Sequence, residues 1–127
     1  MNFLFLLGRL LFGGFFINAG LDHLRKVSMM APYAAMKGVP MAPVSVRLTG
    51  VQLLLGGLSV LLGIWPIVGI ALIVLFLIPT SFIMHAYWSA TEPQAAMADR
   101  VQFLKNIALL GGALMLLAIP RPWIWSL

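Results

Sequence analysis

The sequence predicts an all-α integral membrane protein, a four-helix bundle that forms one domain over residues 1–127. Of the 127 residues, 62% are hydrophobic and only 9% are charged. A soluble domain of this size could not remove so much apolar surface from water. The apolar residues also gather into four stretches of nearly membrane-spanning length, and polar segments separate them. Half of this chain is too short to enclose a core, so a second domain is not expected.

The four apolar stretches define the predicted transmembrane helices. The hydrocarbon core of a bilayer is about 30 Å thick and needs about 20 helical residues. Trp65 and Pro66 alone separate the second stretch from the third, which predicts a tight antiparallel hairpin with Pro66 in the first turn of the next helix. The predicted helices are Phe3–Leu21, Leu48–Trp65, Ile67–Met84 and Val101–Ile119.

The first connection, residues 25–46, is long for such a small bundle, and long loops are commonly functional or disordered. Within it Met29, Met30, Tyr33 and Met36 recur at helical spacing. This pattern predicts a short interfacial helix that lies against the membrane or caps the bundle. A simple interfacial linker is the alternative interpretation.

Positive charge gathers in the first and third connections. The net charge of +5 is therefore read as a topology signal, and we expect no nucleic-acid partner. The positive-inside rule places both connections in the cytoplasm and both termini in the periplasm. Trp65, Trp123 and Trp125 would mark the outer interface. The cationic residues on the inner side are Arg25, Lys26, Lys37, Arg47, Arg100 and Lys105.

Small and polar residues share one face on each of the first two helices. Lipid provides no hydrophobic force between helices, so glycines that allow close approach and interhelical hydrogen bonds must hold them together. The two stripes therefore predict the packing faces. They comprise Arg9, Gly13, Phe16, Gly20 and His23 on the first helix and Thr49, Gln52, Gly56, Ser59 and Gly63 on the second.

Polar residues from all four helices lie towards the cytoplasmic end, which predicts a polar cup beneath the first connection. Ionisable groups inside a membrane are costly and frequently functional, although simple bundle packing or snorkelling would place similar residues there. We assign no catalytic residue and expect no metal site. The predicted ligand-binding residues are His23, Arg47, Gln52, His85, Lys105 and Asn106.

Arg9 stands apart from the cup. It precedes His23 by 14 residues, roughly 21 Å of helical rise, and the three acidic residues are predicted at the other end. We expect its guanidinium either to snorkel to the outer interface or to bond to backbone carbonyls.

An ordered set of motifs resembles the DoxX family of small bacterial inner-membrane proteins. The motifs are Gly8–Gly14 (GRLLFGG) with Gly20 and His23, Thr49–Gly57 (TGVQLLLGG), His85–Trp88 (HAYW) and Phe103–Asn106 (FLKN) before Gly111 and Gly112. The resemblance implies a four-helix bundle. The family takes its name from a thiosulfate:quinone oxidoreductase subunit, which implies a link to membrane redox complexes. The chain departs from the family in having Gln52 where an acidic residue is common.

Two functional classes are favoured. In the first, the chain is a non-catalytic or quinone-interacting subunit of an oxidoreductase system, and its partner is a membrane or peripheral redox protein. His23, Gln52, His85 and Asn106 would donate hydrogen bonds to a quinone or similar amphiphile, and Arg47 or Lys105 would stabilise negative charge. The long first connection would act as a lid.

In the second class, the chain is a non-enzymatic scaffold or assembly factor whose connections or glycine stripes bind a protein. Transport and haem ligation by His23 and His85 are lesser alternatives. Self-association into a homo-oligomer also stays open. No covalent cofactor is expected, and without cysteine any redox role requires a partner or a bound cofactor.

Overall fold

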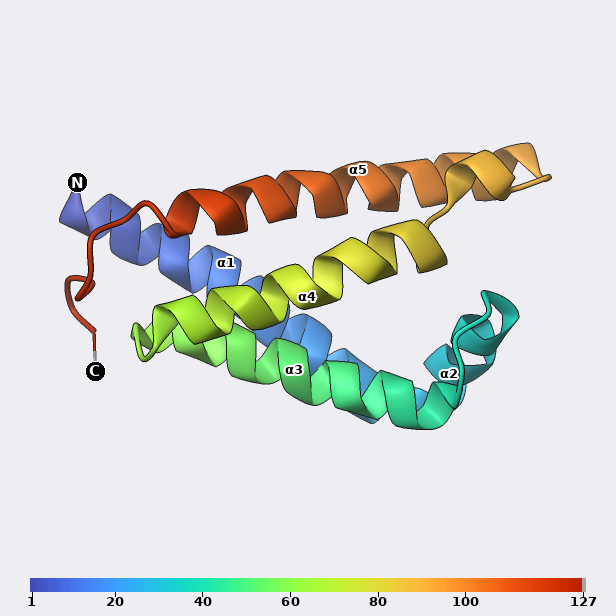
Figure 1. Ribbon diagram of the computed structural model, residues 1–127, viewed down its shortest axis with the longest axis horizontal. Coiled ribbons are helices and arrows are strands. Elements are labelled where there is room, and N and C mark those ends of the chain that lie inside the picture. The colour runs from blue at the N-terminus through green and yellow to red at the C-terminus, as the bar shows by residue number, and fades with distance from the viewer. Residues whose placement is uncertain (127) are drawn as a thin grey trace.

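The computed structural model describes residues 1–126 and confirms the all-α class (Figure 1). Five α-helices and one short 3-10 helix follow one another along this part of the chain. They are α1 (Asn2–Arg25), α2 (Val27–Met36), α3 (Ala42–Leu62), α4 (Pro66–Met84), η1 (Tyr87–Ser89) and α5 (Pro93–Leu116).

Three segments among residues 1–126 are long and apolar enough to cross a membrane: Asn2–Arg25, Ala42–Leu62 and Pro66–Ser89. They correspond to the first three predicted spans and support a membrane protein. The fourth predicted span lies mostly within α5, whose 24 residues extend for roughly 36 Å. Its first turns carry Asp99, Arg100 and Lys105, so composition does not mark α5 as a span. A fourth crossing stays a prediction.

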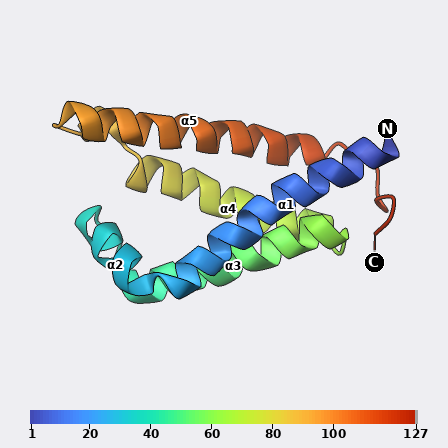
Figure 2. The same ribbon diagram turned by 180° about the vertical axis from the view of Figure 1, so that it is seen from behind.

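The helices form two pairs, α1 with α3 and α4 with α5, which the α3–α4 hairpin joins. The pairs lie close together at the end that holds both termini, and they diverge towards the end that holds α2 (Figures 1 and 2). The first and third connections therefore lie at the same end of the molecule. We call the end near α2 the wide end.

Glycines bring α1 and α3 into backbone contact, which makes this the most extensive helix pair. A Cβ atom on Gly57 would lie 2.7 Å from the carbonyl oxygen of Gly13, and one on Gly20 would lie 2.7 Å from that of Gly50. Gly56, on another face of α3, packs against Gly69 and Ile73 of α4 instead. The glycines of α3 that contact α1 are therefore Gly50 and Gly57, which lie outside the predicted stripe, whereas Gly56 of that stripe faces α4.

The α3–α4 hairpin is as tight as predicted. Gly63 ends α3 in the left-handed conformation, with φ of 72°, and its N–H donates to the carbonyl of Ser59 at 2.9 Å. The Ser59 hydroxyl donates to the carbonyls of Ile64 and Trp65 at 2.6 and 3.0 Å. Pro66 then occupies the first turn of α4, where its missing N–H has no helical partner to lose.

The predicted first connection, residues 25–46, is largely helical. α2 begins at Val27, and α3 begins at Ala42 rather than near Leu48, which leaves 37–41 as the turn. Pro43 fits the first turn of α3, where its missing N–H has no helical partner to lose. A helix thus forms over the Met29–Met36 pattern. Its location at the membrane surface stays a prediction.

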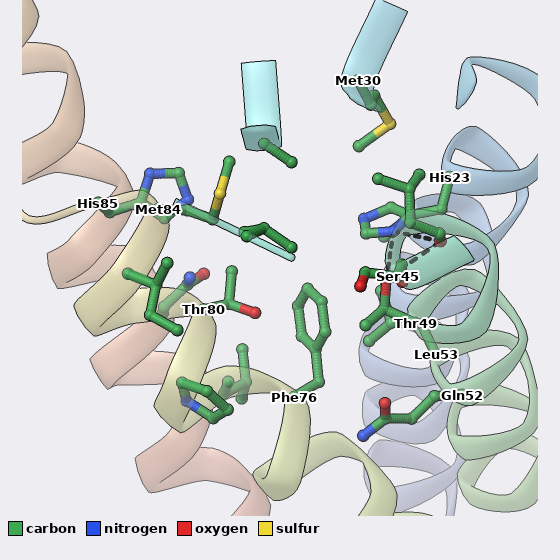
Figure 3. A pocket seen from close by; sticks show the side chains of 18 of the residues that line it. His23, Met30, Ser45, Thr49, Gln52, Leu53, Phe76, Thr80, Met84 and His85 are labelled. Carbon is green, nitrogen blue, oxygen red and sulfur yellow. Dashed lines mark hydrogen bonds between the residues drawn. The ribbon is translucent and has the colours of Figure 1, made fainter. Parts of the chain in front are cut away.

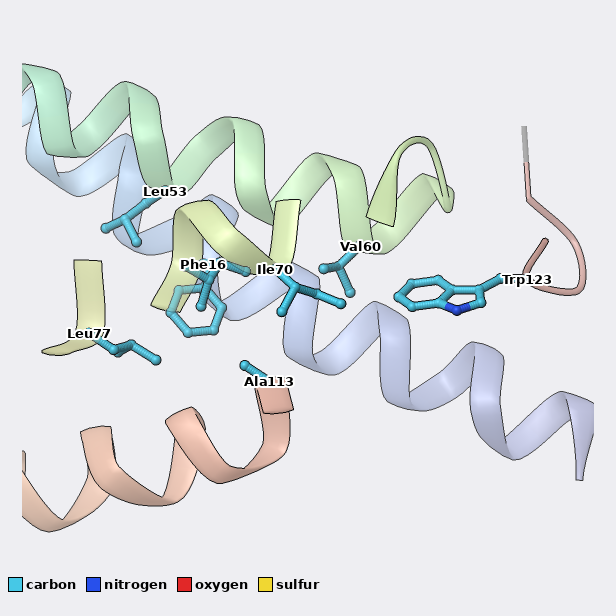
Figure 4. Close-up of a cluster of buried hydrophobic side chains, with 8 residues drawn as sticks. Phe16, Leu53, Val60, Ile70, Leu77, Ala113 and Trp123 are labelled. Carbon is cyan, nitrogen blue, oxygen red and sulfur yellow. The ribbon is translucent and has the colours of Figure 1, made fainter. Parts of the chain in front are cut away.

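The main apolar core lies between the two helix pairs and continues to the end with the termini (Figure 4). Trp123 packs into this core at 3% exposure, and its predicted place at the outer interface stays a prediction. Its ring lies edge-on to Phe5, with centroids 5.3 Å apart. The members of the core are Phe16, Leu53, Val60, Ile70, Ile73, Leu77, Ala113 and Trp123.

Arg9 is buried beside this core at 1% exposure, which excludes snorkelling. Its guanidinium bonds to backbone carbonyls, the other predicted outcome. Nε donates to Val60 at 3.2 Å and Nη2 to Leu61 at 3.0 Å, both in the last turn of α3. The remaining bonds reach Ile124 and Trp125 in the C-terminal segment. One side chain thus joins the first helix, the end of α3 and the tail.

Candidate ligand-binding cleft

A cavity of about 640 Å³ lies between the diverging helix pairs and beneath α2 (Figure 3). Ligand sites in proteins commonly measure about 300–1,000 Å³. Residues from all five α-helices line it. The Gln52 side chain, which lines the cavity, crosses from α3 to α4, where its Nε2 donates to the carbonyl of Leu72 at 2.7 Å. We call this cavity the cleft.

Five of the six predicted ligand-binding residues line the cleft. They come from α1, α3, the end of α4 and α5, as the polar-cup hypothesis required. The exception is Arg47, which is exposed on α3 and lies outside the lining. The five residues are His23, Gln52, His85, Lys105 and Asn106.

The His23 ring is held from one side by α3. Its Nδ1 lies 3.0 Å from the Thr49 hydroxyl oxygen and 3.3 Å from the carbonyl oxygen of Val46. The Thr49 hydroxyl gives its own hydrogen to the carbonyls of Ser45 and Val46, so it accepts from His23. A carbonyl also only accepts, which assigns the proton of the neutral ring to Nδ1. Nε2 then keeps an acceptor lone pair.

The His85 ring has the same arrangement at the end of α4. Its Nδ1 lies 3.4 Å from Oδ1 of Asp99, a residue that is 6% exposed on α5. The other oxygen of Asp99 accepts from Nζ of Lys37 at 2.9 Å. This hydrogen bond raises the pKa of Lys37, so its ammonium stays charged at neutral pH. A charged pair next to the ring therefore assigns the proton of neutral His85 to Nδ1 as well.

Sequence reasoning missed Asp99 and Lys37 as members of this network. Lys37 follows α2 and Asp99 lies in the second turn of α5, 62 residues further along the chain. Hydropathy placed both residues in connections, and only the fold brings them together. The sequence signal that could have drawn attention to Asp99 is the scarcity of acidic residues, because the chain contains only three.

The donors in the cleft are supplied mainly by α5. Asn106 is 5% exposed and lines the cleft. Lys105 donates to Oε1 of Gln102 at 2.7 Å and lies 5.3 Å from the Phe15 ring centroid, so it spans from α5 towards α1. Both residues can donate to an oxygen of a bound molecule.

The rest of the lining is mostly apolar. Phe16, Leu53, Phe76 and Leu77 line one part of it, and α2 covers the wide end with its own side chains (Figure 3). Those side chains are Met29, Met30, Tyr33 and Ala34. The cleft therefore combines apolar walls with a few polar groups, the usual composition of a site for a small amphiphilic molecule.

Within residues 1–126 no group of three or more metal-ligating His, Asp or Glu side chains is present. The cleft offers hydrogen bonds, one exposed ammonium and apolar surface. These groups can orient a ring and a chain, and the imidazoles can hold protons.

Comparison with known proteins identifies one family. The family model described as DoxX matches residues 4–86, which include most of α1, all of α2, α3 and α4, and His23, Gln52 and His85 of the cleft. No curated protein and no solved structure matches the chain.

Proposed function

The chain belongs to the DoxX family of membrane proteins, and on that premise we propose that it binds a quinone or similar small amphiphile in the cleft. It acts there as a non-catalytic membrane subunit of an oxidoreductase system. The observation that carries this proposal is a 640 Å³ cavity with apolar walls and polar groups from four helices. A quinone has matching chemistry, because its ring carries polar oxygens and its chain is apolar.

Each polar group has a role in this proposal. Asn106 and Lys105 donate to the ring oxygens, and Lys105 balances negative charge that develops on them. The apolar walls of Phe16, Leu53 and Phe76 contact the ring and the first part of its chain. Electrons come from a membrane or peripheral redox partner, because the chain has no cysteine of its own to exchange them.

The proposal also includes the topology. α5 crosses the membrane with the other three long helices, and both termini face the periplasm of the bacterial inner membrane. The cationic residues at the wide end support this orientation. The wide end of the cleft then opens near the cytoplasmic interface.

A scaffold role is the second candidate, and one observation favours it. Met29, Met36 and Met41, on α2 and the turn that follows it, are 65%, 83% and 74% exposed. Flexible methionine side chains adapt to varied protein surfaces. In this alternative, α2 with its turn contacts a partner protein and the cleft is filled by lipid.

A matched pair of alanine-to-phenylalanine substitutions tests the quinone proposal. Ala19 lines the cleft on α1, whereas Ala71 is exposed on α4 and lies outside it. Ala19→Phe fills part of the cavity and should weaken binding of a short-chain quinone by about tenfold or more, which corresponds to about 1.4 kcal/mol. Ala71→Phe adds the same ring on the outside and should leave the Kd unchanged. Titration of purified protein in nanodiscs measures both values.

If the two variants and the unsubstituted protein bind the quinone with equal affinity, the cleft is not the binding site. The helix content of both variants, measured by circular dichroism, confirms that each has folded.

A further inference from the structure

Two histidine rings face the cleft from opposite walls, and each turns the same ring nitrogen, Nε2, towards it. His23 belongs to the α1–α3 pair and His85 to the end of α4, and both line the cavity. In each ring Nδ1 points into the protein, towards Thr49 and Val46 or towards Asp99. Figure 3 shows the opposite edge of both rings turned towards the space between the walls. Nε2 is the nitrogen on that edge.

The surroundings favour the neutral form of both rings. The lining around His23 is mostly apolar, and a lone charge is costly in such a place. Beside His85, the negative charge of Asp99 is already paired with Lys37. A neutral ring with its proton on Nδ1 has an unprotonated Nε2, which accepts a hydrogen bond and cannot donate one. The sequence-based expectation that both histidines donate to ligand oxygens is therefore reversed by the local hydrogen bonds.

We propose that the cleft recognises a hydroxyl-bearing ring, a hydroquinone, through hydrogen bonds that its hydroxyl groups donate to Nε2 of His23 and Nε2 of His85. The inference rests on the proposed function, since it names the form of the amphiphile that the same cleft prefers. A quinone carbonyl has no proton to donate, so it makes no hydrogen bond with Nε2 of either histidine. A buried acceptor left without a donor destabilises such a complex.

The preference is measured with three ligands that share one ring and one short chain: the hydroquinone, its dimethyl ether and the quinone. The ether has the same oxygens without the donors and is not oxidised. Under anaerobic conditions the hydroquinone should bind about tenfold more tightly than the ether, because two hydrogen bonds to the histidines are made only by the hydroquinone. The quinone should resemble the ether.

Variants assign the preference to the two rings. His23→Phe and His85→Phe should each lower the hydroquinone-to-ether affinity ratio by about threefold or more, while the affinity for the ether itself changes little. His85→Gln keeps an acceptor oxygen and should retain more of the ratio than His85→Phe. Arg47→Ala is the control, because Arg47 lies outside the cleft. If one phenylalanine variant does not fold, the other and the glutamine variant still decide the result.

Equal binding of hydroquinone and ether by the unsubstituted protein would overturn this inference and leave the cleft as a quinone site. A ratio unchanged in both phenylalanine variants would overturn it as well. Failure of all three ligands to bind would contradict the proposed function instead.

Discussion

At the residue scale, Arg9 shows how a buried cation can be satisfied without an acid. Guanidinium has five donors in a fixed fork, and Arg9 directs them to carbonyls of Val60, Leu61, Ile124 and Trp125. The two α3 carbonyls lie in the last turn, where they lack helical partners and carry partial negative charge. The cation therefore replaces the missing N–H donors at that helix end and fastens the tail.

Removal of this side chain should destabilise the whole end of the molecule. Arg9→Met leaves the carbonyls without a donor, and we expect a loss of about 3 kcal/mol in the free energy of unfolding. Arg121→Met is the matched control, because Arg121 is exposed and makes one bond of 3.5 Å to Leu117. Thermal unfolding in detergent measures both losses. Comparable values for the two variants would contradict the fastening role of Arg9.

The residues also show what the sequence could predict about the site. Depth along the helices was enough to place His23, Gln52, His85, Lys105 and Asn106 around one cavity. It was not enough for Arg47, because depth along a helix does not say which face of the helix a residue occupies. Arg47 lies on an exposed face of α3, outside the cleft. Nor did depth give the direction of the histidine hydrogen bonds, which depends on Thr49 and Asp99 and thus on tertiary contacts.

At the element scale, glycine contacts set the distance between α1 and α3. Carbonyl oxygens of one helix lie where side chains of the other would normally begin, as at Gly13 and Gly57. Such contacts replace the hydrophobic force that lipid cannot supply. The stripe of small residues predicted this role for Gly13 and Gly20 on α1, but the stripe predicted on α3 did not contain their partners Gly57 and Gly50. The sequence also missed the early start of α3 at Ala42, since hydropathy marks where a helix enters lipid rather than where it begins.

Alanine substitutions separate packing from helix propensity. Gly57→Ala forces a methyl group against the Gly13 backbone and should destabilise the fold by about 2 kcal/mol. Gly14→Ala has no atom within 4 Å of the added carbon and should be neutral or stabilise by up to about 1 kcal/mol. Reversible unfolding in mixed micelles compares them. A loss at Gly14 as large as that at Gly57 would argue against backbone contact.

At the scale of the whole molecule, the two helix pairs converge at one end and diverge at the other. At the end with the termini, the Arg9 contacts and Trp123 hold the pairs together, and Gly56 of α3 packs against Gly69 of α4. At the wide end, the pair formed by Lys37 and Asp99 links the end of α2 to α5. A small chain thereby gains a cavity of ligand size without a second domain. The length and hydropathy of the sequence predicted the helices, whereas the divergence of the two pairs is a property of the tertiary packing that neither of them reveals.

The central claim is that this cleft binds an amphiphile with a quinone-type ring. Photocrosslinking with a short-chain azidoquinone, followed by mass spectrometry of the labelled peptides, tests it most directly. The account predicts labels on residues that line the cleft, such as Phe76, Thr80 and His23, and their loss when excess unreactive quinone is present. Labels spread over lipid-facing residues outside the cleft, such as Ala71 or Leu58, and insensitive to competitor would contradict the claim.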